Sequence, residues 1–416
     1  MYSRQRGLRW CEPALFVVEP TKYRQGFITT GITGNYSIIL QINRPYITRL
    51  SYKLFNMLSI SAALSLLSMV PAIRASPVQR CTGTISSLGD VADAVKCTTI
   101  NIESFTVPAG ETFSISAPDG ATINVKGQVT FGVKAWSGPL FELSGKGITF
   151  NGNGYTFNGQ GQEYWDGLGS SGSTKPHPMM KIKSSGTFTN LIVKNSPQQC
   201  FSIGNDATLT ISKVIVDNSD GNNSNSKSGG KPAGHNTDGF DVSASDVTIE
   251  DSTVSNQDDC IAINKGSNII FKGNSCTGGH GISIGSISSG VTVSSVQILN
   301  NVVKNNQNGL RIKTDASATG STVSGVTYSG NTVTGATKYG VIIDQSYPST
   351  LGTPGKNVKI SDITFSGTNT VSVASGAKEV EVNCGDCSGT WNWSGLKVSG
   401  GSAGSSNYKS ISGFSI

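Results

Sequence analysis

The chain has 416 residues, of which 51 are glycine and only 7% are aromatic. This composition argues against a helical bundle and favours a β-rich chain with many turns. The formal charge of +6 comes entirely from residues 1–56, which carry eight Lys or Arg and two acids. The net charge of the remaining residues is therefore zero, and they lack the excess of basic residues that nucleic-acid binding requires.

A short apolar segment begins at residue 57, with Lys53 just upstream, an apolar run over residues 58–70 and small residues near Ala75. This order is typical of a secretory signal peptide, and the run is too short and too Ser-rich for a comfortable membrane span. We therefore predict a signal peptide at residues 57–75 and a secreted, extracellular protein.

The start of the mature protein has alternatives. Arg80 offers a second boundary, which would make residues 76–80 a pro-segment, and a start at Met1 would instead give a signal-anchored membrane protein. Residues 1–56 show no usable periodicity and are interpreted as an upstream extension of unclear role. Cleavage after Ala75 leaves 23 basic and 24 acidic residues, so the mature chain has a net charge of −1. We predict that residues 76–416 form a single domain. We expect this domain neither to bind nucleic acid nor to enter a membrane.

Residues 86–96 (SSLGDVADAVK) space three apolar side chains along one face of a helix, and Ser87 with Asp90 forms a capping pair. The apolar residues are Leu88, Val91 and Val95. We predict a short N-terminal helix that closes the open end of the repeats that follow.

From about residue 140, two families of short β-branched segments alternate at steps of little more than twenty residues, with no helical period between them. The first family aligns Val193, Val216, Val254, Cys276, Val303 and Val333. The second family aligns Ile203, Val242, Ile263, Ile284, Ile312 and Ile343. This pattern predicts an all-β, right-handed parallel β-helix in which each coil stacks its apolar residues on the next coil. A longer step is explained by a polar segment at 221–235, which we predict to be a surface loop.

The second family also aligns charged residues. Four residues before its column, three successive coils carry Asp238, Asp259 and His280. Equivalent positions in a parallel stack lie about 4.8 Å apart, so these side chains should form a row, with Asp258 at the turn beside it. Each motif alone is typical of a turn. Their shared register indicates a functional cleft, because clustered carboxylates without a function cost stability.

Two cations follow on the next coil. Arg311 and Lys313 flank Ile312 and therefore project to the same side of the strand. Alone, such a pair is typical of a solvated face, but in register with the row of acids and the imidazole it adds two cations to the predicted functional cleft.

Seven of the eight cysteines lie after the signal segment, which agrees with export because secreted chains keep disulfides. Cys200 is left without a partner when the others are paired as Cys81–Cys97, Cys260–Cys276 and Cys384–Cys387. The pattern CGDC at 384–387 could instead be a redox motif or a zinc half-site. No second such pair exists, so a structural staple is favoured.

Four segments, in this order and spacing, resemble the motif blocks of the polygalacturonase family of glycoside hydrolases: HNTDGFDV (235–242), NQDDCIAI (256–263), GGHGISIGS (278–286) and RIKT (311–314). The likeness is greatest to the secreted fungal endopolygalacturonases and runs from about Cys81 to Ile416, while residues 1–56 have no counterpart.

The resemblance implies inverting, endo-acting hydrolysis of α-1,4-linked galacturonic acid in demethylated pectin, with no metal or other cofactor. Asp258 matches the general acid, whereas Asp238 and Asp259 match the carboxylates that hold and deprotonate water. Repulsion among these carboxylates would keep a proton on one of them, and His280 would help to set the protonation of Asp258.

By the same resemblance, the substrate would be bound by Arg311, Lys313, Tyr347 and Asn236. The expected partners are pectin or polygalacturonate and plant inhibitor proteins, and the expected oligomeric state is a monomer. The sequence leaves open whether Asn222 or Asn392 is glycosylated.

Four other activities remain as alternatives. An exo-acting polygalacturonase carries similar motif blocks. A pectate lyase would share the β-helix but would need Ca²⁺ and a basic residue that abstracts a proton. A rhamnogalacturonan hydrolase lacks the histidine found here as His280, and a non-catalytic pectin-binding β-helix would be expected to lose one of the three acids.

Overall fold

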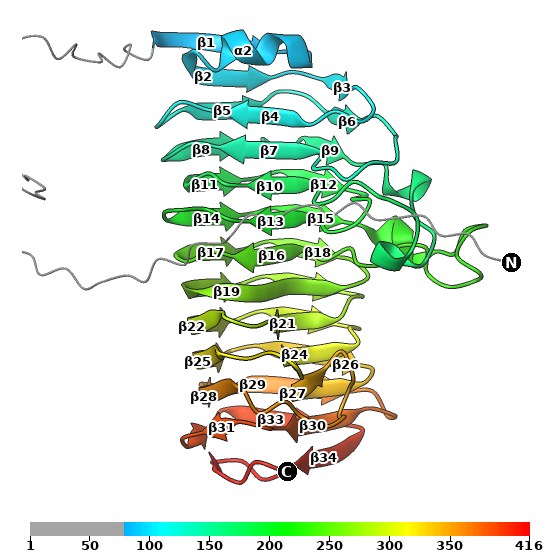
Figure 1. The fold of residues 1–416 in the computed structure, drawn as a ribbon, viewed down its shortest axis with the longest axis vertical. Coiled ribbons are helices and arrows are strands. Elements are labelled where there is room, and N and C mark those ends of the chain that lie inside the picture. The colour runs from blue at the N-terminus through cyan, green and yellow to red at the C-terminus, as the bar shows by residue number, and fades with distance from the viewer. Residues whose placement is uncertain (1–78) are drawn as a thin grey trace, which may run out of the picture. The chain divides into compact units, whose positions relative to one another are not determined.

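The structure, a computed structural model, describes residues 79–416. The predicted signal peptide at 57–75 and the upstream extension at 1–56 lie outside the described residues. Short strands wind around one axis in successive coils, so that each strand pairs in parallel with the equivalent strand of the next coil (Figure 1). The predicted right-handed parallel β-helix is confirmed.

Three parallel sheets, named A, B and C here, run along the stack. Sheet A contains β1 (Gln79–Ile85), β2 (Cys97–Ile102), β5 (Thr122–Val125), β8 (Ile148–Asn151), β11 (Gly186–Thr189), β14 (Leu209–Ser212), β17 (Val247–Glu250), part of β19 (Asp259–Lys272), β22 (Thr292–Leu299), β25 (Ser321–Ser329), β28 (Val358–Ser366) and β31 (Cys387–Ser388). Sheet B contains β3 (Phe105–Val107), β6 (Val129–Phe131), β9 (Thr156–Asn158), β12 (Ile192–Lys194), β15 (Ile215–Asp217), β18 (Thr253–Ser255), β20 (Ser275–Thr277), β23 (Val302–Lys304), β26 (Thr332–Ala336), β29 (Asn369–Val373) and β33 (Leu396–Ser399).

Sheet C carries the acid cluster. Its strands are β4 (Phe113–Ser116), β7 (Phe141–Ser144), β10 (Met180–Ile182), β13 (Phe201–Ile203), β16 (Phe240–Ser243), the first part of β19, β21 (Gly281–Ile287), β24 (Asn308–Asp315), β27 (Tyr339–Tyr347), β30 (Lys378–Asn383) and β34 (Ser402–Ser406). Because β19 runs through both sheets, A and C are continuous there. A separate pair, β32 (Trp391–Asn392) and β35 (Ile411–Ser412), lies near the C-terminus.

The two predicted apolar columns are confirmed residue by residue. In sheet B, Val193 pairs with Val216 and the register continues through the whole predicted column to Val333. In sheet C, the same holds from Ile203 to Ile343. These side chains point inward and are almost completely buried, so stacking them along the axis forms one continuous core.

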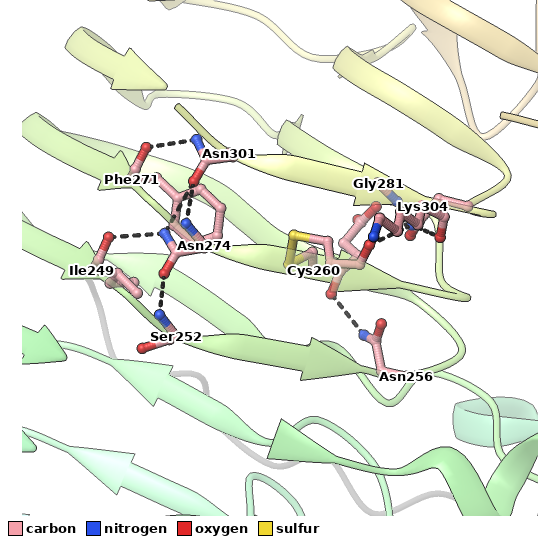
Figure 2. Close-up of a disulfide and its surroundings, with 12 residues drawn as sticks. Ile249, Ser252, Asn256, Cys260, Phe271, Asn274, Gly281, Asn301 and Lys304 are labelled. Atoms are coloured by element: carbon pink, nitrogen blue, oxygen red, sulfur yellow. Dashed lines mark hydrogen bonds between the residues drawn. A yellow bond between two sulfur atoms is a disulfide. The ribbon is translucent and has the colours of Figure 1, made fainter. Parts of the chain in front are cut away.

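A ladder of buried asparagines supports the turns that lead into sheet B. The side chain of Asn274 donates to the carbonyl of Ile249, and Asn301 does the same for Phe271 one coil later (Figure 2). Asn331 and Asn369 continue the ladder. The amides satisfy backbone carbonyls that the turns would otherwise leave buried without partners, which explains why Asn precedes these strands so regularly.

The predicted capping helix is present but shorter than 86–96. It consists of η2 (Leu88–Asp90) followed by α2 (Val91–Ala94). The Asp90 carboxylate accepts hydrogen bonds from the Ser86 N–H and the Ser87 hydroxyl, at 2.9 and 3.1 Å. A Cβ on Gly83 of β1 would overlap Ala94, so a glycine is needed for the helix to lie against this strand. The helix covers the N-terminal end of the coils (Figure 1).

All three predicted disulfides are formed: Cys81–Cys97, Cys260–Cys276 and Cys384–Cys387. Cys200 is buried and is the one cysteine of residues 79–416 outside a disulfide. The CGDC segment is therefore a staple rather than a zinc half-site. No helix in this range is long and apolar enough to cross a membrane.

The polar segment at 221–235 is largely exposed, as predicted, and follows η5 (Ser219–Asn222). It also packs against a second long connection, between β9 and β10, which contains η3 (Gly161–Glu163) and η4 (Gly169–Ser171). Gly167 N–H donates to the Ala233 carbonyl at 2.8 Å, and η3 contacts η5. The two connections project from the same side of the stack (Figure 1).

Candidate active site

The acid cluster lies where three successive turns lead from sheet B into sheet C. Asp238 precedes β16, Asp258 and Asp259 stand at the start of β19, and His280 precedes β21. All three carboxylates are buried, and His280 is partly exposed. The turns are held close together because each coil repeats the backbone path of the one before it.

Asp258 contacts three donors. Its Oδ1 lies 2.8 Å from His280 Nδ1 and accepts the backbone N–H of Asp259 at 2.8 Å, while its Oδ2 accepts Asn236 Nδ2 at 2.9 Å. Burial disfavours the ionised form of Asp258, but contact with His280 and the charge of Lys313 outweigh it and lower the pKa to about 2. Asp258 is therefore ionised in the unliganded site.

The pKa of His280 shifts in the opposite direction to that of Asp258. Burial lowers the pKa of this imidazole, but its hydrogen bond to Asp258 and the charges of Asp258 and Asp259 raise it above the usual value of 6.5. At mildly acidic pH the two side chains therefore hold a single proton between them, mostly on the imidazole.

Asp259 is the most enclosed of the acids. Its Oδ1 accepts the Ser283 hydroxyl at 2.6 Å, and its Oδ2 accepts Lys313 Nζ at 2.7 Å. Lys313 was expected to bind substrate, yet its ammonium is paired with this carboxylate, which raises the lysine pKa although burial lowers it. The lysine also lies over the ring of Tyr347, 5.3 Å from its centroid, a cation–π distance.

Asp238, unlike Asp258, has a raised pKa. Burial, together with the charges of Asp258, Asp241 and Asp259, raises the pKa of Asp238 well above the usual range. Repulsion among neighbouring carboxylates therefore favours a proton on Asp238, in line with the expectation that one member of the cluster keeps a proton. Asp258 differs because it has His280 as a partner.

The expected position of His280 was wrong by one residue. Counting back from the apolar column placed it opposite Asp259, but Asp259 pairs with Gly281 and Ile261 with Ile282, so β19 bulges at Cys260. The bulge shifts the start of β19 relative to β21. His280 N–H consequently donates to the Asp258 carbonyl, and the imidazole meets the Asp258 carboxylate.

The disulfide lies directly beneath this bulge. Cys260 is bonded to Cys276 of the next coil, and Asn256 Nδ2 donates to the carbonyl of Asp259 at 2.9 Å (Figure 2). The same amide also donates to the Thr237 carbonyl at 2.9 Å. Together these bonds hold the two turns that carry the three acids against each other.

Sequence reasoning missed Asp241. It is on the outer face of sheet C, opposite Ser202 and Ala262, and burial together with the charges of Asp259 and Asp258 raises its pKa to about 7. The signal was present, because the alternation of β16 places Asp241 outward next to the inward Val242.

The other expected substrate-binding residues lie around the cluster. Arg311 is partly exposed and follows Ser283 in register on sheet C, and no carboxylate in residues 79–416 lies within ion-pair distance of its guanidinium. The Asn236 amide contacts Asp258 on one side and Ser170 on the other. A cavity of about 370 Å³ opens beside His280 and Gln257.

Asp258, Asp259 and His280 place three potential metal-ligand atoms within 4.8 Å of one another. The donor set does not fit a bound cation, because the Lys313 ammonium already neutralises Asp259 and the imidazole is engaged with Asp258. The cluster is organised around its own lysine and histidine.

Comparison with known proteins identifies the family to which the chain belongs. The model of the glycosyl hydrolases family 28 matches residues 97–414. The chain belongs to this family. It is therefore a glycoside hydrolase, as the motif blocks predicted.

Two fungal members illustrate how similar the family-28 relatives are. The chain is 44% identical over 363 residues to an endopolygalacturonase I of Aspergillus oryzae, covering 83% of this chain and 95% of that protein. It is 42% identical over 353 residues to an endopolygalacturonase B of Emericella nidulans, covering 82% and 94%.

A solved structure of an endopolygalacturonase has the same fold as this chain. Endopolygalacturonase I from Stereum purpureum, complexed with two galacturonate, is 48% identical and superposes with a TM-score of 0.76, covering 79% of this chain and 98% of that one. The endo-xylogalacturonan hydrolase of Aspergillus tubingensis, at 23% identity and a TM-score of 0.55, shares the fold.

Proposed function

We propose that this protein is an endopolygalacturonase that hydrolyses α-1,4-galacturonosyl linkages in demethylated pectin with inversion. The observation that carries the proposal is the pairing within the acid cluster. His280 Nδ1 lies 2.8 Å from Asp258 Oδ1 and Asp259 is paired with Lys313, in a family-28 chain that is 44% identical to an endopolygalacturonase I.

The leaving oxygen is protonated by the Asp258–His280 pair. Because Asp258 is ionised when the site is empty, the proton it delivers comes from the His280 imidazolium, 2.8 Å away. As the bond between C1 and the glycosidic oxygen breaks, the proton passes to that oxygen. A group that holds a proton near the working pH suits general acid catalysis.

The attacking water is held by Asp238 and Asp259. Its oxygen bonds to C1 from the face opposite the leaving group, and its proton passes to this pair of carboxyl groups. Lys313 and Ser283 support Asp259 from behind. The first product then has the inverted anomeric configuration, which proton NMR of the new reducing end tests.

Arg311 is the cation that remains available for a uronate carboxylate, because Lys313 is paired with Asp259. A guanidinium can bind a carboxylate through two parallel hydrogen bonds. Replacing Arg311 by Gln should reduce the preference for demethylated over methyl-esterified pectin, measured as the ratio of kcat/KM on the two substrates. An unchanged ratio would remove Arg311 from this role.

The deciding experiment for endo action is the size distribution of early products from polygalacturonate. An endo-acting enzyme releases a mixture of oligomers and lowers viscosity before many reducing ends appear, whereas an exo-acting enzyme releases only the smallest products from the start. The Asp258→Asn protein, purified identically, controls for contaminating activity.

The proposal also includes secretion of the protein, a monomeric state and binding by plant inhibitor proteins. Export through the segment at 57–75 would give a mature N-terminus near Ser76, which Edman sequencing of secreted protein tests. The mature protein would be a monomer by light scattering. Plant inhibitor proteins would bind it by family resemblance, and an inhibition assay with a purified inhibitor tests this.

A further inference from the structure

The outer oxygen of Asp258 is contacted by an amide that is itself held from far away in the sequence. Asn236 Nδ2 donates to Asp258 Oδ2 at 2.9 Å. On the other side, Asn236 Oδ1 accepts both the backbone N–H and the hydroxyl of Ser170, each at 3.1 Å, 66 residues upstream. His235 Nδ1 also lies 3.0 Å from this oxygen. The donors on Oδ1 orient the amide so that its N–H group faces Asp258.

Ser170 belongs to a turn built around a buried ion pair, within residues 166–175, which we call the Asp166–Lys175 loop. Lys175 Nζ donates to Asp166 Oδ2 at 2.8 Å and to the carbonyls of Gly169 and Ser173, each at 3.0 Å. The side chains of the two charged residues are 1% and 12% exposed.

Burying a lysine in a surface connection costs desolvation energy, and the cost is offset only when its donors are satisfied. Here the ammonium has one carboxylate and two carbonyl acceptors, so the turn at Ser170 has a single well-defined geometry. Asp166 also accepts the N–H groups of Leu168 and Ser173, at 3.0 and 2.9 Å.

The loop and Asn236 are in tight contact. Gly169 has a positive φ of 55°, a conformation that favours glycine. A Cβ built on it would overlap the Oδ1 of Asn236 and crowd Nδ1 of His235. The loop can therefore approach Asn236 this closely only because residue 169 is a glycine.

We propose that the Asp166–Lys175 loop is a positioning element for the general acid: it holds the Asn236 amide, and the amide holds the Asp258 carboxyl group in the orientation for proton delivery. This role differs from the expected direct binding of substrate by Asn236. The inference rests on the proposed function of Asp258.

The test uses single variants of the full-length secreted protein. Gly169→Ala pushes on Asn236 without changing charge, and Ser170→Ala removes the hydroxyl donor to Asn236. Ser171→Ala, at an exposed neighbour, is the matched control. We expect Gly169→Ala to lower kcat by about 10- to 100-fold with KM nearly unchanged, because a small misplacement of a reacting group is costly. Ser170→Ala should show a smaller loss that Ser170→Thr restores, and Ser171→Ala should behave as wild type.

The pH profile separates positioning from a general loss of packing. Losing a hydrogen-bond donor raises the pKa of a carboxylate, so the alkaline limb of kcat/KM, where the Asp258–His280 pair loses its proton, should move to higher pH in Gly169→Ala. Asn236→Leu, which is similar in size and removes the donor without adding a charge, should move it further. The charged groups that face Asp258 stay the same in all variants: Asp238, Asp241, Asp259, His280 and Lys313.

The outcomes are distinct. A raised KM with unchanged kcat in Gly169→Ala and Asn236→Leu would overturn the proposal and assign Asn236 to substrate binding. Wild-type kinetics and pH profile in both would overturn it as well. If Gly169→Ala fails to fold, Asn236→Leu decides alone. A wild-type protein inactive on polygalacturonate would instead refute the proposed function.

Discussion

Sheet C carries two groups of ion pairs, one on its N-terminal coils and one on its central coils. In the first group, Glu142 of β7 contacts Lys181 of β10 at 3.6 Å and Lys183, which follows β10, at 2.7 Å. The two lysine side chains are 37% and 44% exposed. Such pairs are well solvated and contribute little to stability.

The second group has similar distances but different surroundings. Asp258 pairs with His280 and Asp259 with Lys313, and the two carboxylate side chains are only 9% and 1% exposed. The comparison shows that the repeat supplies the spacing for ion pairs anywhere on the sheet. Burial under the long connections decides which pairs can tune protonation for chemistry.

Removing one acid from each group should give the largest contrast. Asp258→Asn should lower kcat by about 10²–10⁴-fold with KM close to wild type, because the loss falls on proton transfer. Glu142→Gln should leave kcat unchanged. Steady-state kinetics on polygalacturonate measure both, and an Asp258→Asn variant that keeps more than about a tenth of the wild-type rate would remove Asp258 from the role of general acid.

Removing one lysine from each group compares how much the two groups of ion pairs contribute to the free energy of unfolding. Lys313→Met leaves the Asp259 carboxylate buried without its cation and should lower the free energy of unfolding by about 3–5 kcal/mol. Lys183→Met should change it by less than about 1 kcal/mol. Urea unfolding at pH 7 measures both. Adding Asp259→Asn to Lys313→Met should recover most of the loss, and equal effects of the two lysine variants would contradict the comparison.

The pH dependence tests the shared proton. The pKa of His280 is raised by Asp258, so the protonated imidazole is present below that pKa and is lost as pH rises through it. Wild-type kcat/KM should therefore fall on the alkaline side at a pH above 6.5. In His280→Asn this ionisation disappears from the profile. His177→Asn, at an exposed histidine, should leave the profile as in wild type.

The smallest effect concerns stability at Asp238. Its raised pKa means that the folded protein resists an ionisation that occurs freely in the unfolded chain, so Asp238 destabilises the fold once pH exceeds the usual carboxyl range. Asp238→Asn should raise the melting temperature at pH 7 by a few degrees and make no difference near pH 3. Asp206→Asn, at an exposed acid after β13, should change neither. A lower melting temperature for Asp238→Asn at pH 7 would mean that this carboxyl is not held neutral.

Much of the fold could be predicted from local pattern. The alternation that buries Val242 and Ile263 repeats on every coil, so one correct alignment gives the register of a whole sheet. Cys260 and Cys276 could be paired because each lies close to a column, one coil apart. The three acids and His280 could be placed in one cleft for the same reason.

The contacts within the cleft could not be predicted in this way. The bulge at Cys260 moves His280 from Asp259 to Asp258, and a bulge leaves no mark in the periodicity on which the alignment depends. Asp241 was overlooked because its importance comes from the charges around it and not from its motif.

The sequence by itself determined the stacked coils, the disulfides and which charged residues share a face, because these follow from the two-residue period of strands and the spacing of the repeats. Only the tertiary structure decided that Lys313 pairs with Asp259, that the pKa values of Asp238 and His280 are raised, and that Ser170 contacts Asn236. The physical reason is that pairing and protonation depend on burial and on neighbours in space, and the residues that meet here are 54 and 66 positions apart in the chain.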